Sequence, residues 1–94
     1  MQFNELYEII ADRKNNPQPG SYTCSLLDAG MEEISKKVGE EAIEVILAAN
    51  VQSDQRTVEE ISDLLYHLMV LMVARGIPLD AVQEELHNRH HPKK

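Results

Sequence analysis

The sequence predicts an all-α fold, a helical bundle of four main helices with a central antiparallel helix pair. Apolar residues recur at a helical spacing of three and four positions in four segments. Clusters of proline, glycine and asparagine separate these segments. No segment shows the alternation of apolar and polar residues that predicts a strand. The 94 residues are therefore expected to form a single domain, 1–94.

The first helix is predicted at about residues 2–13. Its apolar residues at helical spacing are Phe3, Leu6, Tyr7, Ile9 and Ile10. The run 15–20 is rich in proline and asparagine and ends in glycine, so the helix is expected to stop before it. The polar residues 21–25 are predicted as a loop, with at most one helical turn at residues 26–27 before Gly30.

Two long helices form the predicted antiparallel pair, one at 31–50 and one from about 54 to 75. The apolar stripe of the first runs through Ile34, Val38, Ala42, Val45 and Ala49. Ser53 or Asp54 can cap the second helix, and Gly76 ends it. Because the turn between the helices is short, the two helices are expected to lie antiparallel.

A last helix is predicted from Pro78, which suits a first helical turn, through about Asn88. The end of the chain is rich in histidine and lysine: His87, His90, His91, Pro92, Lys93 and Lys94. Histidines of this kind could bind a metal ion, but a terminal segment is more often frayed. We therefore expect a frayed end.

The composition excludes several classes of partner. The formal net charge is -7 and the pI about 4.9, so phosphate backbones and anionic membranes would repel the chain. We expect no nucleic-acid or membrane partner. The longest apolar run, residues 64–74, is shorter than the roughly 18 residues of a membrane span. Cys24, the single cysteine, has no intrachain partner, and no basic and then apolar signal segment begins the chain, which favours a cytoplasmic location.

Both central helices are apolar beyond one stripe. Ile43 and Leu47 lie on the far side of the first helix, and residues 69–73 surround nearly all of the second. A helix that is apolar on all sides requires burial on all sides, which one small chain hardly provides. The sequence therefore predicts a homodimer, with pairing of dimers into a tetramer left open. The alternative is that the methionine-rich positions are ordinary core filling.

Two carboxylate pairs lie on the central helices, Glu41 with Glu44 and Glu60 with Asp63. Residues three apart on a helix share one face, so an antiparallel pair brings the four acids together. Carboxylates this close repel one another, which favours a bound hard cation, with Mg2+ as the first candidate. The alternative is a solvated surface, since acidic pairs are common on exposed helices.

The helical positions of these acids border the apolar stripes. With Val38 at the centre of one stripe, Glu41 and Glu44 lie on its flank. With Ile61 at the centre of the other, Glu60, Asp63 and His67 lie together. Glu40 and Glu59 are farther from the stripes and are either surface charges or residues that support a metal ligand or activate water. His67 is either a hydrogen-bonded histidine of the groove or a phosphate contact.

Three runs carry a resemblance to a known family: Gly20-Ser21-Tyr22-Thr23, residues 37–45 (Lys-Val-Gly-Glu-Glu-Ala-Ile-Glu-Val) and residues 60–67 (Glu-Ile-Ser-Asp-Leu-Leu-Tyr-His). Together they resemble the phosphoribosyl-ATP pyrophosphohydrolases of histidine biosynthesis, over nearly the whole chain. That family lies within the all-α MazG-like nucleotide pyrophosphohydrolases, which share a pattern of Glu-Glu-x-x-Glu followed by Glu-x-x-Asp. The residues that match this pattern are Glu40, Glu41, Glu44, Glu60 and Asp63.

The resemblance implies Mg2+-dependent hydrolysis of phosphoribosyl-ATP to phosphoribosyl-AMP and pyrophosphate. Metal ligands would be Glu41, Glu44, Glu60 and Asp63, and Glu40 or one of these ligands would take the proton of the attacking water. The residues expected to bind the substrate are Ser21, Tyr22, Thr23, Lys37 and His67. The number of metal ions stays open.

Other functions remain open alternatives. One is a house-cleaning nucleoside triphosphate pyrophosphohydrolase of the same superfamily, and another is a non-enzymatic helical interaction module whose acids only solubilise a dimer. A di-iron bundle would need paired Glu-x-x-His motifs. The chain offers one, Glu84 with His87, away from the acidic helices.

Overall fold

The computed structural model describes residues 1–91 and, within this range, consists of five helices without a strand. The helices are α1 Phe3–Asn15, α2 Tyr22–Ala29, α3 Met31–Val51, α4 Asp54–Arg75 and α5 Leu79–His90. The predicted all-α class is confirmed, with one short helix added to the four main ones. Residues 92–94 of the predicted domain lie outside the described part of the chain.

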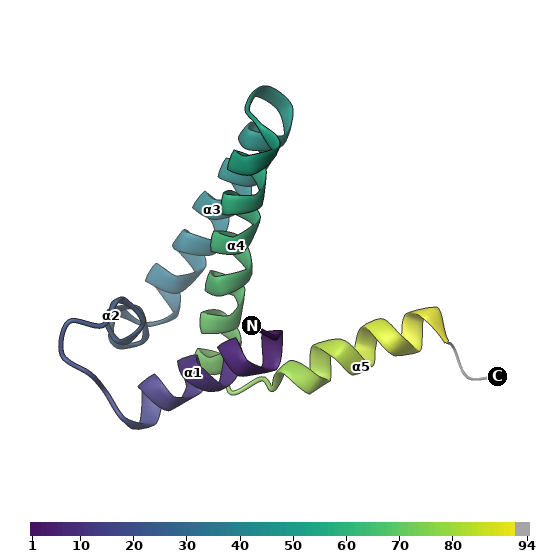
Figure 1. Ribbon diagram of the computed structural model, residues 1–94. Helices are drawn as coiled ribbons and strands as arrows, with labels where there is room; N and C mark the ends of the chain where they lie inside the picture. Colours follow the sequence, from purple (N-terminus) through teal and green to yellow (C-terminus); the bar gives the residue numbers. More distant parts are fainter. Residues whose placement is uncertain (92–94) are drawn as a thin grey trace.

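α3 and α4 form a long antiparallel hairpin that carries the other helices at one end (Figure 1). The side chain of Ser53 accepts a hydrogen bond from the backbone N–H of Arg56 at 3.1 Å and caps α4. Gly76 has a φ of 72°, the left-handed conformation that commonly ends a helix. The predicted central pair and both predicted ends of α4 are confirmed.

Residues 22–29 form α2, so the prediction of a loop with at most one helical turn is wrong. Ser21 caps the helix by accepting a hydrogen bond from the N–H of Cys24 at 3.2 Å, and Gly30, with a φ of 93°, ends it. Leu26 is 3% exposed. A helix of eight residues is unstable by itself in water, so the burial of Leu26 in the core supplies the stability that the local sequence lacks.

The core lies where α1 and α2 pack against the hairpin, at the end away from its turn (Figure 1). Its buried residues are Ile10, Leu26, Ile34, Met69, Val70 and Val73. Met69, Val70 and Val73 are therefore ordinary core residues. For this part of α4, the alternative of core filling applies and not the predicted oligomer interface. The core holds the C-terminal half of α4 in a fixed position and leaves the half near the turn in contact with α3 alone (Figure 1).

The turn half of the hairpin exposes apolar side chains. They are Ile43, Ile46, Leu47, Val51, Val58 and Ile61. The prediction that Ile61 lies at the centre of a core stripe is wrong, because it is 42% exposed, and Val38 is only half-buried. The physical reason is that only one helix packs against each of these helices here, so one apolar stripe on each is left uncovered. Hereafter these six residues are called the apolar face.

α5 projects away from the hairpin (Figure 1). Leu79 is buried, whereas residues 80–91 are exposed. The predicted frayed end is helical as far as His90, and its last three residues lie outside the described range. Among residues 1–91, no single helix has the length and apolarity of a membrane span, and α4 and α5 meet that test only as a pair bent by 111° at the break between them.

Candidate metal centre

Three carboxylates meet between α3 and α4. Glu41 of α3 and Glu60 and Asp63 of α4 each offer one oxygen, and these oxygens lie within 4.8 Å of one another. The antiparallel packing brings Glu41 opposite two residues that are one helical turn apart. Glu60 is 6% exposed and Asp63 is exposed, so the group has a buried back and an open front. We call this group the carboxylate cluster.

The surroundings of Glu41 oppose the ionisation of its carboxyl group. Burial raises the pKa of Glu41 above its ordinary value, and the charges of Asp63 and Glu60 raise it further, while His67 acts in the opposite direction. An all-oxygen donor set with three adjacent acids matches the ligands that Mg2+ prefers. A divalent cation would also offset the repulsion by Asp63 and Glu60 that adds to this raised pKa. The residues present therefore fit the implied metal.

Arg56 is the cation in direct contact with the carboxylate cluster. Its Nη2 donates a hydrogen bond to Oε1 of Glu60 at 2.5 Å, and its Nη1 donates to Glu59. The contact with Glu60 joins two residues four apart on α4, which is the spacing at which helical side chains meet. The spacing of four residues between Arg56 and Glu60 is a sequence signal for this contact, whereas the predicted site rested on acidic pairs three residues apart.

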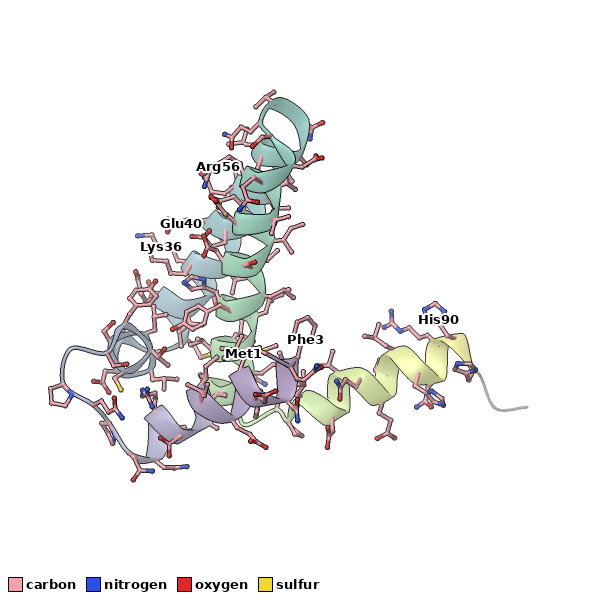
Figure 2. All side chains as sticks on the ribbon, viewed as in Figure 1. Met1, Phe3, Lys36, Glu40, Arg56 and His90 are labelled. Atoms are coloured by element: carbon pink, nitrogen blue, oxygen red, sulfur yellow. The ribbon has the colours of Figure 1, made fainter. Side chains whose placement is uncertain are left out.

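The other predicted acids lie outside the carboxylate cluster. Glu44 is one turn beyond Glu41 on α3 and is exposed, so the structure brings together three of the four predicted ligands. Glu40 is also exposed and lies on the same side of the hairpin as Lys36 and Arg56 (Figure 2). Lys37, the predicted phosphate contact, is half-buried.

The predicted substrate loop is the start of α2, and its hydroxyl groups are hydrogen-bonded within the chain. Ser21 caps α2, and the hydroxyl of Thr23 is hydrogen-bonded to that of Tyr66. The hydroxyl of Tyr22 donates to Nε2 of His67 at 3.0 Å. Sequence reasoning gave no role to Tyr66, although it lies in the run that resembles the family.

His67 connects α2 to the carboxylate cluster. Its Nδ1–H donates to the backbone carbonyl of Asp63 at 2.7 Å, since a carbonyl oxygen only accepts. This leaves Nε2 to accept from Tyr22. His67 is 6% exposed, and the rings of Tyr22 and Tyr66 contact it edge-on. The two hydrogen bonds, from Tyr22 to His67 and from His67 to the carbonyl of Asp63, thus fix the position of α2 relative to one of the candidate ligands.

Replacing Glu41 by glutamine is expected to stabilise the metal-free protein at neutral pH. Because the pKa of Glu41 is raised in the folded state, the folded protein loses this proton less readily than the unfolded chain. Stability contributed by the protonated acid is therefore lost as the pH rises from the ordinary carboxyl range through the raised pKa. Urea unfolding of both proteins in EDTA at pH 7 and pH 4 measures this difference. An equal or lower stability of Glu41→Gln at pH 7 would contradict it.

Comparisons with known proteins agree with the sequence resemblance. The family model described as phosphoribosyl-ATP pyrophosphohydrolase matches residues 3–90. The chain is 52% identical over 86 residues to the phosphoribosyl-ATP pyrophosphatase of Listeria monocytogenes serotype 4b (strain CLIP80459), covering 92% of this chain and 82% of that protein. It is 49% identical over 90 residues to the phosphoribosyl-ATP pyrophosphatase of Methanococcoides burtonii, covering 94% and 91%. A Clostridium botulinum protein of the same name (strain Kyoto / Type A2) is 49% identical over 86 residues, covering 92% and 78%.

Proposed function

This chain belongs to the phosphoribosyl-ATP pyrophosphohydrolase family, and we propose that the carboxylate cluster is the Mg2+-binding centre of its active site. The function of the protein is the hydrolysis of phosphoribosyl-ATP to phosphoribosyl-AMP and pyrophosphate in histidine biosynthesis. The observation that carries the proposal is the meeting of Glu41, Glu60 and Asp63 within 4.8 Å. A bound divalent ion would neutralise phosphate oxygens and lower the pKa of the attacking water.

Each of the remaining acids, and Lys37, has a distinct role in the proposed site. Glu60 is the buried ligand in this proposal, and Asp63 faces the open side where a substrate can enter. Glu44 is our proposed fourth ligand, which requires its exposed side chain to turn toward the carboxylate cluster. Glu40, or one of the ligands, accepts the proton of the attacking water. Lys37, one turn before Glu41, contacts a phosphate as a point charge.

In this proposal, the start of α2 binds the part of the substrate that lies away from the metal centre. Because the hydroxyls of Ser21, Tyr22 and Thr23 already have partners, we propose that they act mainly by holding α2 in place. For one of these hydroxyls, or for His67, to contact the substrate, a hydrogen bond within the chain must be replaced by one to the substrate. This makes the Tyr22–His67 bond the most informative one to remove.

Replacing Tyr22 by phenylalanine is expected to lower kcat/KM several-fold, about as much as one lost hydrogen bond costs. The free energy of unfolding should fall by about 1 kcal/mol. Tyr7→Phe is a matched control, because the hydroxyl of Tyr7 donates to the carbonyl of Ile77 at 2.7 Å, away from the carboxylate cluster. The control should lose similar stability without loss of activity. If both variants lose activity equally, the Tyr22 bond has no special role in the site.

We propose that a second copy of the chain packs against the apolar face. The exposed residues lie in the same half of the hairpin as the carboxylate cluster, and a large exposed apolar surface is uncommon on a monomer. A two-fold dimer would bury this surface against itself. Consistent with the single Cys24, the proposed location is the cytoplasm.

Pyrophosphate release is the measurement that tests the substrate and the metal together. We expect release from phosphoribosyl-ATP with Mg2+, little release in EDTA, and slower turnover of ATP, GTP, CTP and UTP. Equal turnover of all the triphosphates would favour the house-cleaning alternative. An interaction module would release none, and millimolar Mg2+ would leave its melting temperature unchanged, whereas a ligand that binds the native state raises it.

A further inference from the structure

Arg56 occupies a position that the family resemblance does not assign. It lies one turn before Glu60 on α4, on the same side of the hairpin as Glu40 and Lys36 (Figure 2). Its guanidinium joins the buried Glu60 to the exposed Glu59. Within residues 1–91, no other lysine or arginine forms an ion pair with the carboxylate cluster.

We propose that Arg56 is the counter-ion of Glu60 while the metal is absent, and a phosphate-binding residue once the metal is bound. The inference rests on the proposed metal site. A buried carboxylate beside two others requires a compensating positive charge, and Arg56 supplies it through the 2.5 Å hydrogen bond. A divalent cation in the carboxylate cluster replaces this compensation. The two positive charges would then lie on the same carboxylate and repel each other.

Once a metal ion compensates the charge of Glu60, Arg56 can leave this carboxylate at little cost. Its side chain is 48% exposed, so it needs no rearrangement of the core to swing outward. Its other partner, Glu59, is 46% exposed, and ion pairs between exposed side chains contribute little to stability. The guanidinium therefore becomes available beside the metal centre when Glu60 turns to the metal.

A phosphate chain is the ligand that suits the released guanidinium. Its planar donors match two phosphate oxygens at once, which an ammonium group does not. Arg56 is tethered one helical turn from a metal ligand, so its donors stay near any phosphate that the metal holds. Arg56 would thus stabilise bound substrate at one edge of the site.

Calorimetric titration with Mg2+ alone tests the first half of the proposal. Arg56→Gln should bind Mg2+ about five- to tenfold more tightly than wild type, because it removes a competing charge. Arg56→Lys keeps the charge and should change the affinity less. Arg89→Gln is the matched control, since Arg89 forms an i,i+4 pair with Glu85 on the remote α5, and its affinity should equal that of wild type.

Steady-state kinetics at saturating Mg2+ test the second half. Arg56→Gln should raise KM for phosphoribosyl-ATP about tenfold while kcat changes less than about twofold. Arg56→Lys should recover part of the loss in KM. A residue that only positions Glu60 would instead lower kcat and weaken Mg2+ binding.

The outcomes separate this inference from the proposed function. If wild type binds no Mg2+, the metal site itself is refuted. If wild type binds Mg2+ but Arg56→Gln binds it equally or more weakly, the counter-ion role is overturned. An unchanged KM in Arg56→Gln overturns the phosphate-binding role.

Discussion

Replacing Asp63 by asparagine is expected to lower pyrophosphate release from phosphoribosyl-ATP by about a thousandfold or more. Because Asp63 is a proposed metal ligand, its loss is expected to remove several kcal/mol of charge stabilisation by the metal, and each 1.36 kcal/mol is tenfold in rate. Asp63 is exposed, so the substitution leaves no buried group without a partner. Its backbone carbonyl still accepts the hydrogen bond from His67. The measurement is turnover in saturating Mg2+, with the circular dichroism spectrum as a check on folding.

Glu60→Gln extends this expectation to the buried member of the proposed ligand set. We expect a similar loss of turnover and a metal-free fold that is unchanged or slightly more stable, because repulsion within the carboxylate cluster is relieved. Arg56 keeps its contact with Glu59 in this variant, so no buried charge is left unpaired. Asp80→Asn and Glu84→Gln, both exposed on α5, are the controls and should retain full activity. Retained activity in Glu60→Gln together with a marked loss of stability would mean that Glu60 is structural.

Replacing Ile46 by glutamate is expected to convert the proposed dimer to monomers. Ile46 is 62% exposed in the single chain and belongs to the apolar face. In a two-fold interface each substitution appears twice, so two buried charges without partners would be introduced. Size-exclusion chromatography with light scattering at micromolar protein gives the mass directly.

The control for this substitution is Ile9→Glu. Ile9 is also a partly exposed isoleucine, but it lies on α1, outside the apolar face. This variant should keep the mass of wild type. A wild-type protein that is monomeric at micromolar concentration, or an Ile46→Glu variant that remains dimeric, would refute the proposed interface.

The ends of the central helices could be predicted because local chemistry determines them. Ser53 caps α4 through its side chain, and Gly76 ends it in a conformation that glycine adopts freely. The meeting of Glu41 with Glu60 and Asp63 could also be predicted, because a short turn and the spacing of three residues leave few other arrangements. Local rules therefore predict the hairpin and all three acids of the carboxylate cluster, together with Glu44, which lies outside it.

The remaining features depend on tertiary packing. α2 is a helix because Leu26 enters the core, which no local propensity of residues 22–29 indicates. The helical wheel placed Ile61 in the core and Glu60 on its flank, whereas Glu60 is buried and Ile61 exposed. A helical wheel centred on apolar residues cannot distinguish an apolar stripe that packs against the other helix from an apolar stripe that is exposed. The contact of Thr23 with Tyr66 joins residues 43 positions apart and has no local signal.

The position of a bound metal ion tests the central claim most directly. Crystals grown with Mn2+ in place of Mg2+, measured for anomalous scattering, locate the ion without any assumption about activity. We predict an anomalous peak bounded by the carboxylates of Glu41, Glu60 and Asp63, with the guanidinium of Arg56 turned away from Glu60. The same map shows whether Glu44 has turned inward as the fourth ligand. A peak found elsewhere, or none between α3 and α4, would contradict the assignment of the carboxylate cluster as the metal centre.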